Sequence, residues 1–161
     1  KKELNAILPN GKKRKEQYEL RIGAIPFTVV KNDLMIMLIT AKSTADTTWI
    51  VPKGKIEPDM TKAESAELEA FEEAGVHGHL YDEVLDSFTF ARRGKPVHVS
   101  LFPLRILQIV DPSDWVENKL RRRTLVTVQQ AVRMVGYPGL AGVLHQHAGY
   151  LKKLARGEPA V

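Results

Sequence analysis

Three glutamates near the middle of the chain, Glu69, Glu72 and Glu73, are spaced three and four residues apart. On a helix these spacings bring side chains onto one face, where three like charges repel each other. A divalent cation would relieve the repulsion, because Mg²⁺ and Mn²⁺ prefer carboxylate oxygen and water as ligands. The spacing therefore indicates a carboxylate metal site, with a solvated acidic helix face as the alternative interpretation.

The surrounding residues predict the helix that such a site needs. Thr61 and Glu64 form the pattern of a capping box, in which each side chain bonds the other residue's backbone N–H. Gly75 is suited to end the helix. Small residues recur on one stripe of this helix and would let it lie close to a sheet: they are Ala63, Ala66, Ala70 and Ala74. The three glutamates fall on roughly the opposite face.

A longer pattern contains these glutamates. The segment from Gly54 to Val76 resembles the Nudix box, which opens with a glycine and ends in R-E-U-x-E-E-x-G-U, where U is a bulky aliphatic residue. Gly54 takes the place of the first glycine, and Ala70 takes the first aliphatic position. The places that match the end of the box are Glu69, Glu72, Glu73, Gly75 and Val76. A match over this length, preceded by the strand-like segment 49–51, is specific.

Two positions depart from the box. Met60 stands where the family has a glutamate, and Leu68 stands where it has an arginine. In the family these two side chains pair, so the departures resemble an ion pair replaced by an apolar contact, a change that is often neutral. We expect the scaffold and the metal site to survive. The alternative is a degenerate box that binds a ligand and turns it over poorly.

The resemblance implies hydrolysis of a pyrophosphate linkage with Mg²⁺ or Mn²⁺. Glu69, Glu72, Glu73 and the carbonyl of Gly54 or Lys53 would hold the metal, and Glu72 or Glu73 would act as general base. Cationic side chains would grip the phosphates: the candidates are Arg21, Lys53, Lys55, Arg92, Arg93, Arg121 and Arg123. Exposed, solubilising charges are the alternative interpretation for the arginine clusters.

Length and composition predict one domain. The chain has 161 residues, of which 43% are hydrophobic and 27% are charged, and it contains no cysteine. That is long enough to bury a core without disulfides. No apolar run approaches the roughly 18 residues of a membrane helix, and we expect a cytoplasmic protein. We expect residues 1–20 to form a flexible basic arm, residues 21–155 one domain and residues 156–161 a tail.

The order of expected elements predicts an α/β fold with a mixed sheet, which resembles the Nudix αβα sandwich with helices on both faces. Pro26 suggests an edge or a bulge in the first strand. The expected strands are 21–30, 34–40, 49–51, 80–91, 96–107 and 121–127, with helices over 61–75, 127–135 and 140–154. The resemblance runs from about Arg21 to Val135.

The partners follow from the same residues. The segment Trp49–Gly54, the basic turn 92–95 and the arginines 121–123 resemble the diphosphoinositol-polyphosphate and diadenosine-polyphosphate phosphohydrolase branch. A polyphosphorylated small molecule is therefore the expected substrate. The net charge of +5 alone would also suit a nucleic acid, but the chain shows no nucleic-acid-binding motif. The sequence does not indicate an oligomeric state.

Overall fold

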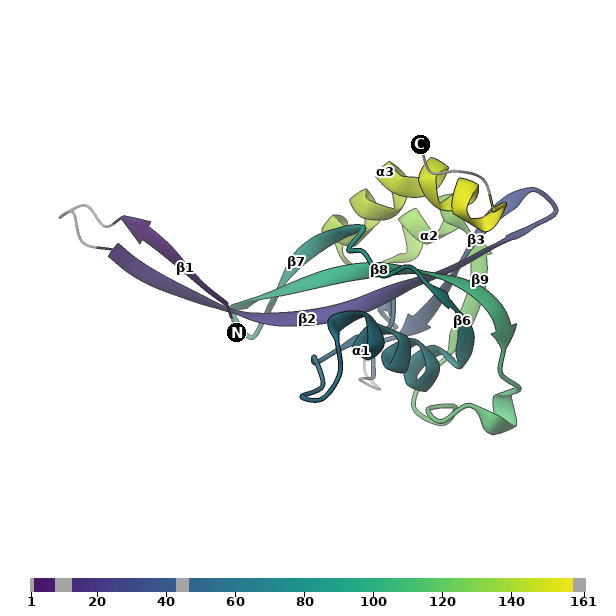
Figure 1. Ribbon diagram of the computed structural model, residues 1–161, viewed down its shortest axis with the longest axis horizontal. Helices are drawn as coiled ribbons and strands as arrows, with labels where there is room; N and C mark the ends of the chain where they lie inside the picture. Colours follow the sequence, from purple (N-terminus) through teal and green to yellow (C-terminus); the bar gives the residue numbers. More distant parts are fainter. Residues whose placement is uncertain (1, 8–12, 43–46, 158–161) are drawn as a thin grey trace.

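The computed structural model describes residues 2–7, 13–42 and 47–157. In these residues the chain forms a mixed sheet with helices on both faces (Figure 1). The strands are β1 (Lys2–Ile7), β2 (Lys13–Val30), β3 (Asp33–Thr40), β4 (Trp49–Ile50), β5 (Lys53–Gly54), β6 (Val76–Leu80), β7 (Asp86–Arg92), β8 (Lys95–Ile109) and β9 (Arg123–Thr127). The expected αβα sandwich is confirmed.

The sheet is mixed because β2 and β8 run parallel at its centre, while the other strand pairs are antiparallel. The main strand order is β4-β3-β2-β8-β6. Four further strands attach to it: β1 and β5 pair with β2, β7 pairs with β8, and β9 pairs with β3. This arrangement places β5, which carries two expected site residues, directly beside β2.

Each face of the sheet buries its own apolar core. Helix α1 (Lys62–Glu69) covers one face with the expected alanine stripe, whose members are buried: Ala63, Ala66, Ala70 and Ala74. Helices α2 (Val128–Met134) and α3 (Pro138–Ala155) cover the other face (Figure 1). Alternate residues of β3 serve the two cores, as the period of a strand requires. None of the helices in the described ranges is long and apolar enough to cross a membrane.

The start of α1 follows the predicted chemistry. The Thr61 backbone N–H donates to Glu64 Oε1 at 2.8 Å, and the Glu64 N–H donates to Thr61 Oγ1 at 3.1 Å. Thr127 and Gln130 form the same reciprocal pair before α2. Gly75 ends the acidic helix with a left-handed backbone, at φ 63°.

The acidic helix is not α-helical throughout. After α1 the chain continues as a π-helical turn over Ala70–Ala74, in which the N–H of Gly75 bonds the carbonyl of Ala70 five residues earlier. A π turn holds more residues than an α turn, so side chains beyond residue 70 lie at different angles from those an α-helix predicts. Such turns occur frequently at functional sites.

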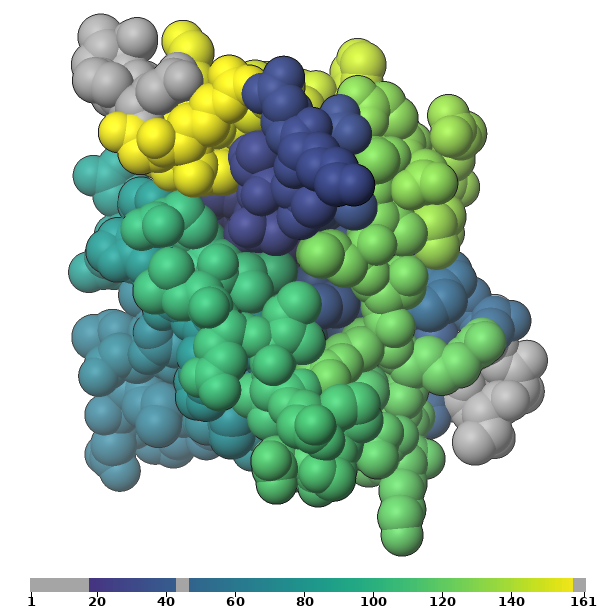
Figure 2. Space-filling view, turned by 90° about the vertical axis from the view of Figure 1, so that its right-hand side faces the viewer, coloured from purple at the N-terminus to yellow at the C-terminus, as the bar shows by residue number. Residues whose placement is uncertain are grey.

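Tight turns fix the β2–β3 hairpin and the β7–β8 hairpin. Lys31 and Asn32 both have positive φ, at 49° and 71°, which is the geometry of a two-residue hairpin turn that matches strand twist. Arg93 and Gly94 repeat it between β7 and β8. Figure 2 shows the β2–β3 turn (purple) against the last turns of α3 (yellow).

Three sequence expectations need correction. The run 80–91 is two strands, because β6 ends at Leu80 and β7 starts only at Asp86. Pro26 lies in a central strand, at the point where β2 changes its partner from β5 to β3, so its missing N–H costs no ladder bond to β5 or β3 there. The last strand starts at Arg123, which leaves Arg121 in the preceding loop.

The N-terminal residues form strand structure. Figure 1 shows β1 and the start of β2 as a two-stranded ribbon that extends away from the rest of the molecule. The flexibility expected for residues 1–20 stays a prediction, as do the domain boundaries.

Candidate metal and phosphate site

A cavity of about 690 Å³ brings together residues from distant parts of the chain. Carboxylates and cations line it side by side: Glu57, Glu69, Glu73, Arg21, Lys42, Lys53, Lys55, Arg92 and Arg121. Gly54, Ile50, Phe90 and Tyr137 complete much of its wall. The sheet positions β5, the acidic helix supplies two carboxylates, and the end of β7 supplies Arg92. The expected carboxylate and phosphate-gripping residues thus largely share one cavity.

Glu73 is the most constrained of these carboxylates. It is only 9% exposed, its Oε1 accepts from the Lys53 backbone N–H at 3.0 Å, and its Oε2 pairs with the Arg121 guanidinium at 3.0 Å. Burial raises the pKa of Glu73, and Arg121 opposes that rise. The carboxylate is therefore held in one orientation by a backbone donor and a buried cation.

Glu69 lies against the glycine that opens the motif. Burial, followed by the charges of Glu73 and Glu72, raises the pKa of Glu69 to about 8. A Cβ at position 54 would overlap the Glu69 carboxylate, so only glycine leaves room for that carboxylate against the backbone. Repulsion between neighbouring carboxylates is the condition that a bound cation would relieve.

Glu72 is placed differently. It is half-buried and does not line the cavity, and its backbone carbonyl accepts from the Trp115 indole N–H at 3.1 Å. The π turn accounts for this difference, because it rotates residues 72 and 73 relative to Glu69 and leaves only Glu73 on the cavity side. A metal-ligand or general-base role for Glu72 stays a prediction.

The donors of the cavity suit a hard divalent cation in part. Across the described ranges, no group of three or more acidic, histidine or cysteine side chains is arranged to hold a metal ion. Mg²⁺, however, commonly takes only one or two carboxylates and fills its shell with water and substrate phosphate. Glu69 and Glu73, with the backbone of Gly54 alongside, fit that pattern.

Five expected phosphate ligands line the cavity: Arg21, Lys53, Lys55, Arg92 and Arg121. Burial, with the nearby charges of Arg92, Arg121 and Arg21, lowers the pKa of Lys53, while Glu73 opposes the shift. Arg21 pairs with Glu19 at 2.8 Å, and the Lys53 ammonium lies 5.0 Å from the centre of the Phe90 ring. Cations crowded in this way favour an anionic ligand between them.

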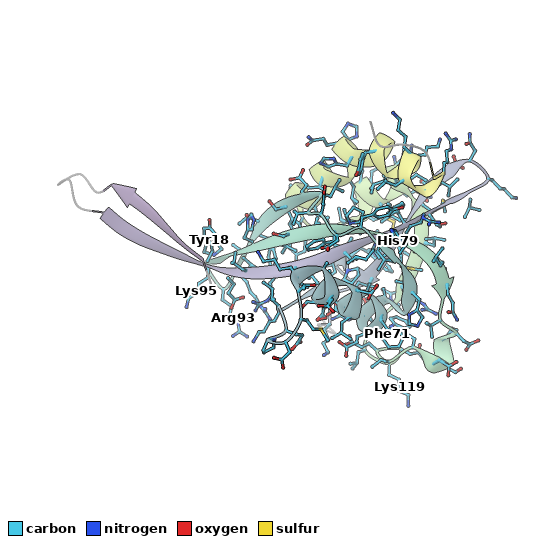
Figure 3. The ribbon with its side chains drawn as sticks, in the orientation of Figure 1. Tyr18, Phe71, His79, Arg93, Lys95 and Lys119 are labelled. Carbon is cyan, nitrogen blue, oxygen red and sulfur yellow. The ribbon has the colours of Figure 1, made fainter. Side chains whose placement is uncertain are left out.

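Arg93 lies outside this cavity. It lines a neighbouring hollow of about 250 Å³ with Glu19, Lys95, Val97 and Arg92, and Arg92 alone among them borders both spaces. Figure 3 shows Arg93 and Lys95 near Tyr18, at the end of the sheet where β7 turns into β8. Arg93 therefore does not lie beside the carboxylates, and its contact with a phosphate stays a prediction.

The three successive arginines have three different environments. Arg121 reaches the carboxylates, and Arg122 lies over the Trp49 ring at 5.6 Å. Arg123 donates to the carbonyls of Ala74 and Gly75 at 3.1 and 3.2 Å and lies over the Trp115 ring at 4.6 Å. The placement of Arg123 differs from the expected phosphate contact: its guanidinium binds the end of the acidic helix and does not line the cavity.

Several site residues lacked a sequence signal. Glu117 accepts from Arg121 Nε at 2.7 Å, and the Thr40 carbonyl accepts from the same guanidinium at 2.9 Å. The ring centres of Phe90 and Tyr137 lie 4.7 Å apart at the cavity wall. Of these, only the i, i+4 spacing of Glu117 and Arg121 could have suggested a pair in advance.

Met60 and Leu68, the two departures from the box, differ in exposure. Met60 is 40% exposed and Leu68 is half-buried. A contact between them stays a prediction, and a glutamate at position 60 would reach solvent, so its charge would cost little stability.

A second hollow, of about 740 Å³, lies between α3 and the segment that joins β6 to β7. Its lining includes Asp82, Glu83 and His147, and no lysine or arginine among the residues that the structure describes. It therefore does not suit a polyphosphate.

Comparison with known proteins agrees with the motif. The chain is 27% identical over 150 residues to Nudix hydrolase 12, mitochondrial, of Arabidopsis thaliana, covering 80% of this chain and 72% of the relative. It is 29% identical over 154 residues to Nudix hydrolase 16, mitochondrial, of the same plant, covering 84% of each. It is also 29% identical over 147 residues to diphosphoinositol polyphosphate phosphohydrolase 2 of Mus musculus, covering 89% of this chain and 74% of the relative. No family model matches the chain.

Solved structures share the fold. A Caenorhabditis elegans Ap4A hydrolase aligns with TM-score 0.65 at 16% identity, over 84% of this chain and 99% of that one. The Nudix domain of Shewanella oneidensis NrtR, in complex with ADP ribose, aligns with TM-score 0.62 at 13% identity, over 84% and 90%. Together with the box, the sequence relatives make the chain similar to the Nudix hydrolase family, whose fold it shares. Within it, the chain resembles the diphosphoinositol polyphosphate phosphohydrolase branch.

Proposed function

We propose that this protein is a metal-dependent hydrolase that cleaves a pyrophosphate linkage in a polyphosphorylated small molecule. The observation that carries the proposal is the shared cavity, in which Glu69 and Glu73 face Lys53, Lys55 and Arg92. Carboxylates alone would repel phosphate, and cations alone would bind it without activating water. Their combination suits attack of water on a bound phosphoric anhydride.

The chain's own residues would divide the work. Lys55 and Arg92 hold the phosphates. The fixed orientation of Glu73 keeps its carboxylate in the cavity that Glu69 also lines. Bound at Glu69, Glu73 and the Gly54 carbonyl, Mg²⁺ or Mn²⁺ would supply charge neutralisation and a more acidic water. Glu72 and Glu73 remain candidates for the general base.

The substrate class follows from the branch and from the number of cations. We propose a diphosphoinositol polyphosphate or a dinucleoside polyphosphate, because some curated relatives are named for the first and a structural neighbour is an Ap4A hydrolase. Both substrates carry more phosphates than a nucleoside diphosphate sugar does. Arg92, Arg93 and Lys95 extend the cationic surface beyond the metal site, as such substrates need.

Phosphate release from both substrates, with Mg²⁺ or Mn²⁺ and with chelator, tests the proposal directly. Glu69→Gln, Glu72→Gln and Glu73→Gln should be compared with Glu67→Gln, which changes an exposed glutamate on the same helix. We expect losses of at least about a hundredfold for Glu73→Gln and for whichever variant removes the base, and parent activity for Glu67→Gln. Parent rates in all three site variants would refute the assignment.

A catalytically weak module that binds a phosphorylated ligand is the second candidate, favoured by the departures at Met60 and Leu68. Binding of a substrate with Mg²⁺ but no phosphate release would support it.

A cytoplasmic location is proposed on the sequence alone. Since relatives include proteins named mitochondrial and chloroplastic, imaging of the tagged full chain is the test.

A further inference from the structure

Arg121 uses all three nitrogens of its guanidinium inside the protein. Its NH2 group pairs with Glu73 Oε2 at 3.0 Å, its Nε pairs with Glu117 Oε1 at 2.7 Å, and its NH1 donates to the Thr40 carbonyl at 2.9 Å. Only 6% of the side chain is exposed. Although Arg121 also borders the cavity, its guanidinium is committed to protein oxygens.

These contacts connect three separate elements at the carboxylate site. Glu73 belongs to the π turn, Thr40 ends β3, and Glu117 lies in the loop that precedes β9. The Arg122 backbone N–H adds a bond to Thr40 Oγ1 at 2.9 Å. Arg121 therefore holds the loop against the acidic helix, and it places a fixed positive charge where a cation would approach Glu73.

A divalent cation and Arg121 cannot both make full use of Glu73. One oxygen of this carboxylate accepts from the Lys53 N–H and the other pairs with Arg121. Two cations that share one buried carboxylate also repel each other strongly in a medium of low dielectric constant. Binding of a metal to Glu73 must therefore weaken the pair with Arg121.

We propose that Arg121 is a built-in counter-cation that competes with the divalent metal for Glu73. Metal binding displaces the NH2 group of the guanidinium from this carboxylate, and this group can then contact an anionic substrate in the cavity, while Nε and NH1 keep their bonds to Glu117 and Thr40. This inference rests on the proposed function, since it takes Glu73 as a metal ligand. It makes Arg121 a positioning residue in the metal-free protein, which sets how tightly the site takes up metal.

Binding of Mn²⁺ alone, measured by calorimetry or by the EPR signal of free Mn²⁺, tests the competition without any turnover. Arg121→Gln should bind Mn²⁺ about fivefold or more tightly than the parent, the lower end of typical coupling between two binding events. Arg122→Gln is the matched control. It removes the same charge from the next residue, whose guanidinium lies over the Trp49 ring and does not pair with Glu73. Equal affinities in the two variants, or weaker binding by Arg121→Gln, would overturn the proposal.

The parent protein provides a second measurement if Arg121→Gln fails to fold. Amide hydrogen exchange over residues 117–122 should speed up on addition of Mg²⁺ if the guanidinium leaves Glu73, and unchanged or slower exchange would contradict the release. The two hypotheses can fail separately. If the parent hydrolyses its substrate with Mg²⁺ while Arg121→Gln binds Mn²⁺ as Arg122→Gln does, only the competition is contradicted. If the parent neither binds Mn²⁺ nor releases phosphate, both the proposed function and the competition are contradicted.

Discussion

At the scale of single residues, identical side chains have unrelated tasks because their backbone positions differ. Arg121 precedes β9 and points to the carboxylates, whereas Arg123 begins β9 and binds the end of the acidic helix. Composition and spacing predicted a cluster of positive charge here. They did not predict which guanidinium faces the cavity, because this depends on a loop whose course the sequence pattern leaves open.

Gly54 gives the sharpest prediction at this scale. A methyl group in Gly54→Ala would overlap the Glu69 carboxylate and push this flexible side chain away from the backbone. We expect phosphate release to fall by at least about tenfold, the effect of a misplaced catalytic group. The melting temperature should change little, since Glu69 can swing aside. Gly142→Ala, at a helical position where a Cβ meets nothing within 4 Å, is the control. Full activity in Gly54→Ala would mean that the position of Glu69 does not matter.

At the scale of elements, local signals were sufficient where one segment decides the outcome. The capping box of Thr61 and Glu64, the alanine stripe and the helix end at Gly75 were predicted and are confirmed. The π turn was not predicted, since it depends on how the helix end docks onto Trp115 and Arg123, more than forty residues away. For this reason the sequence placed three glutamates on one face, while the structure brings two of them to the cavity.

Arg123 should stabilise the end of the acidic helix. It donates to the carbonyls of Ala74 and Gly75, where the helix ends and its last carbonyls lack partners within the helix. It also donates to the carbonyl of Val110, just after β8. Arg123→Met should lower the free energy of unfolding by about 1–3 kcal/mol, the cost of leaving buried polar groups unsatisfied. Urea unfolding measures it, with Arg133→Met, an exposed position on α2, as the control. A loss no greater than that of the control would show that water replaces the guanidinium at no cost.

At the scale of the whole molecule, a polar contact made by His147 joins the C-terminal helix to the sheet. His147 Nε2 of α3 lies 2.8 Å from Asp86 Oδ2 at the start of β7. The hydrogen bond to His147, followed by that from the Ser87 N–H, lowers the pKa of Asp86. A lowered carboxyl pKa stabilises the fold above the unfolded-state pKa, and this contribution is lost as the pH falls through the folded-state value.

Asp86→Asn should therefore make the free energy of unfolding depend less on pH under acidic conditions. We expect the parent to exceed the variant by less than about 1 kcal/mol near neutral pH, because the Asp86 side chain is 33% exposed and solvent screens the pair. The difference should shrink toward zero as the pH falls below about 4. Urea unfolding of both proteins across this range is the measurement. A difference that grows on acidification would have the wrong sign for this contact.

The distribution of charge over the molecule predicts substrate preference. The chain carries a net charge of +5, and Arg92 borders both the metal cavity and the neighbouring hollow, whereas Arg93 borders only the hollow. Attractions between these cations and phosphates are screened by salt, so KM for a polyphosphorylated substrate should rise from low to physiological ionic strength.

Arg92→Gln should raise this KM by about tenfold or more, the scale of one charge-assisted hydrogen bond. Arg93→Gln should raise it less, and should affect a nucleoside diphosphate sugar hardly at all, because that smaller substrate does not reach the hollow. Equal effects of both variants on both substrates, together with a KM insensitive to salt, would show that the cationic surface does not select for phosphate number.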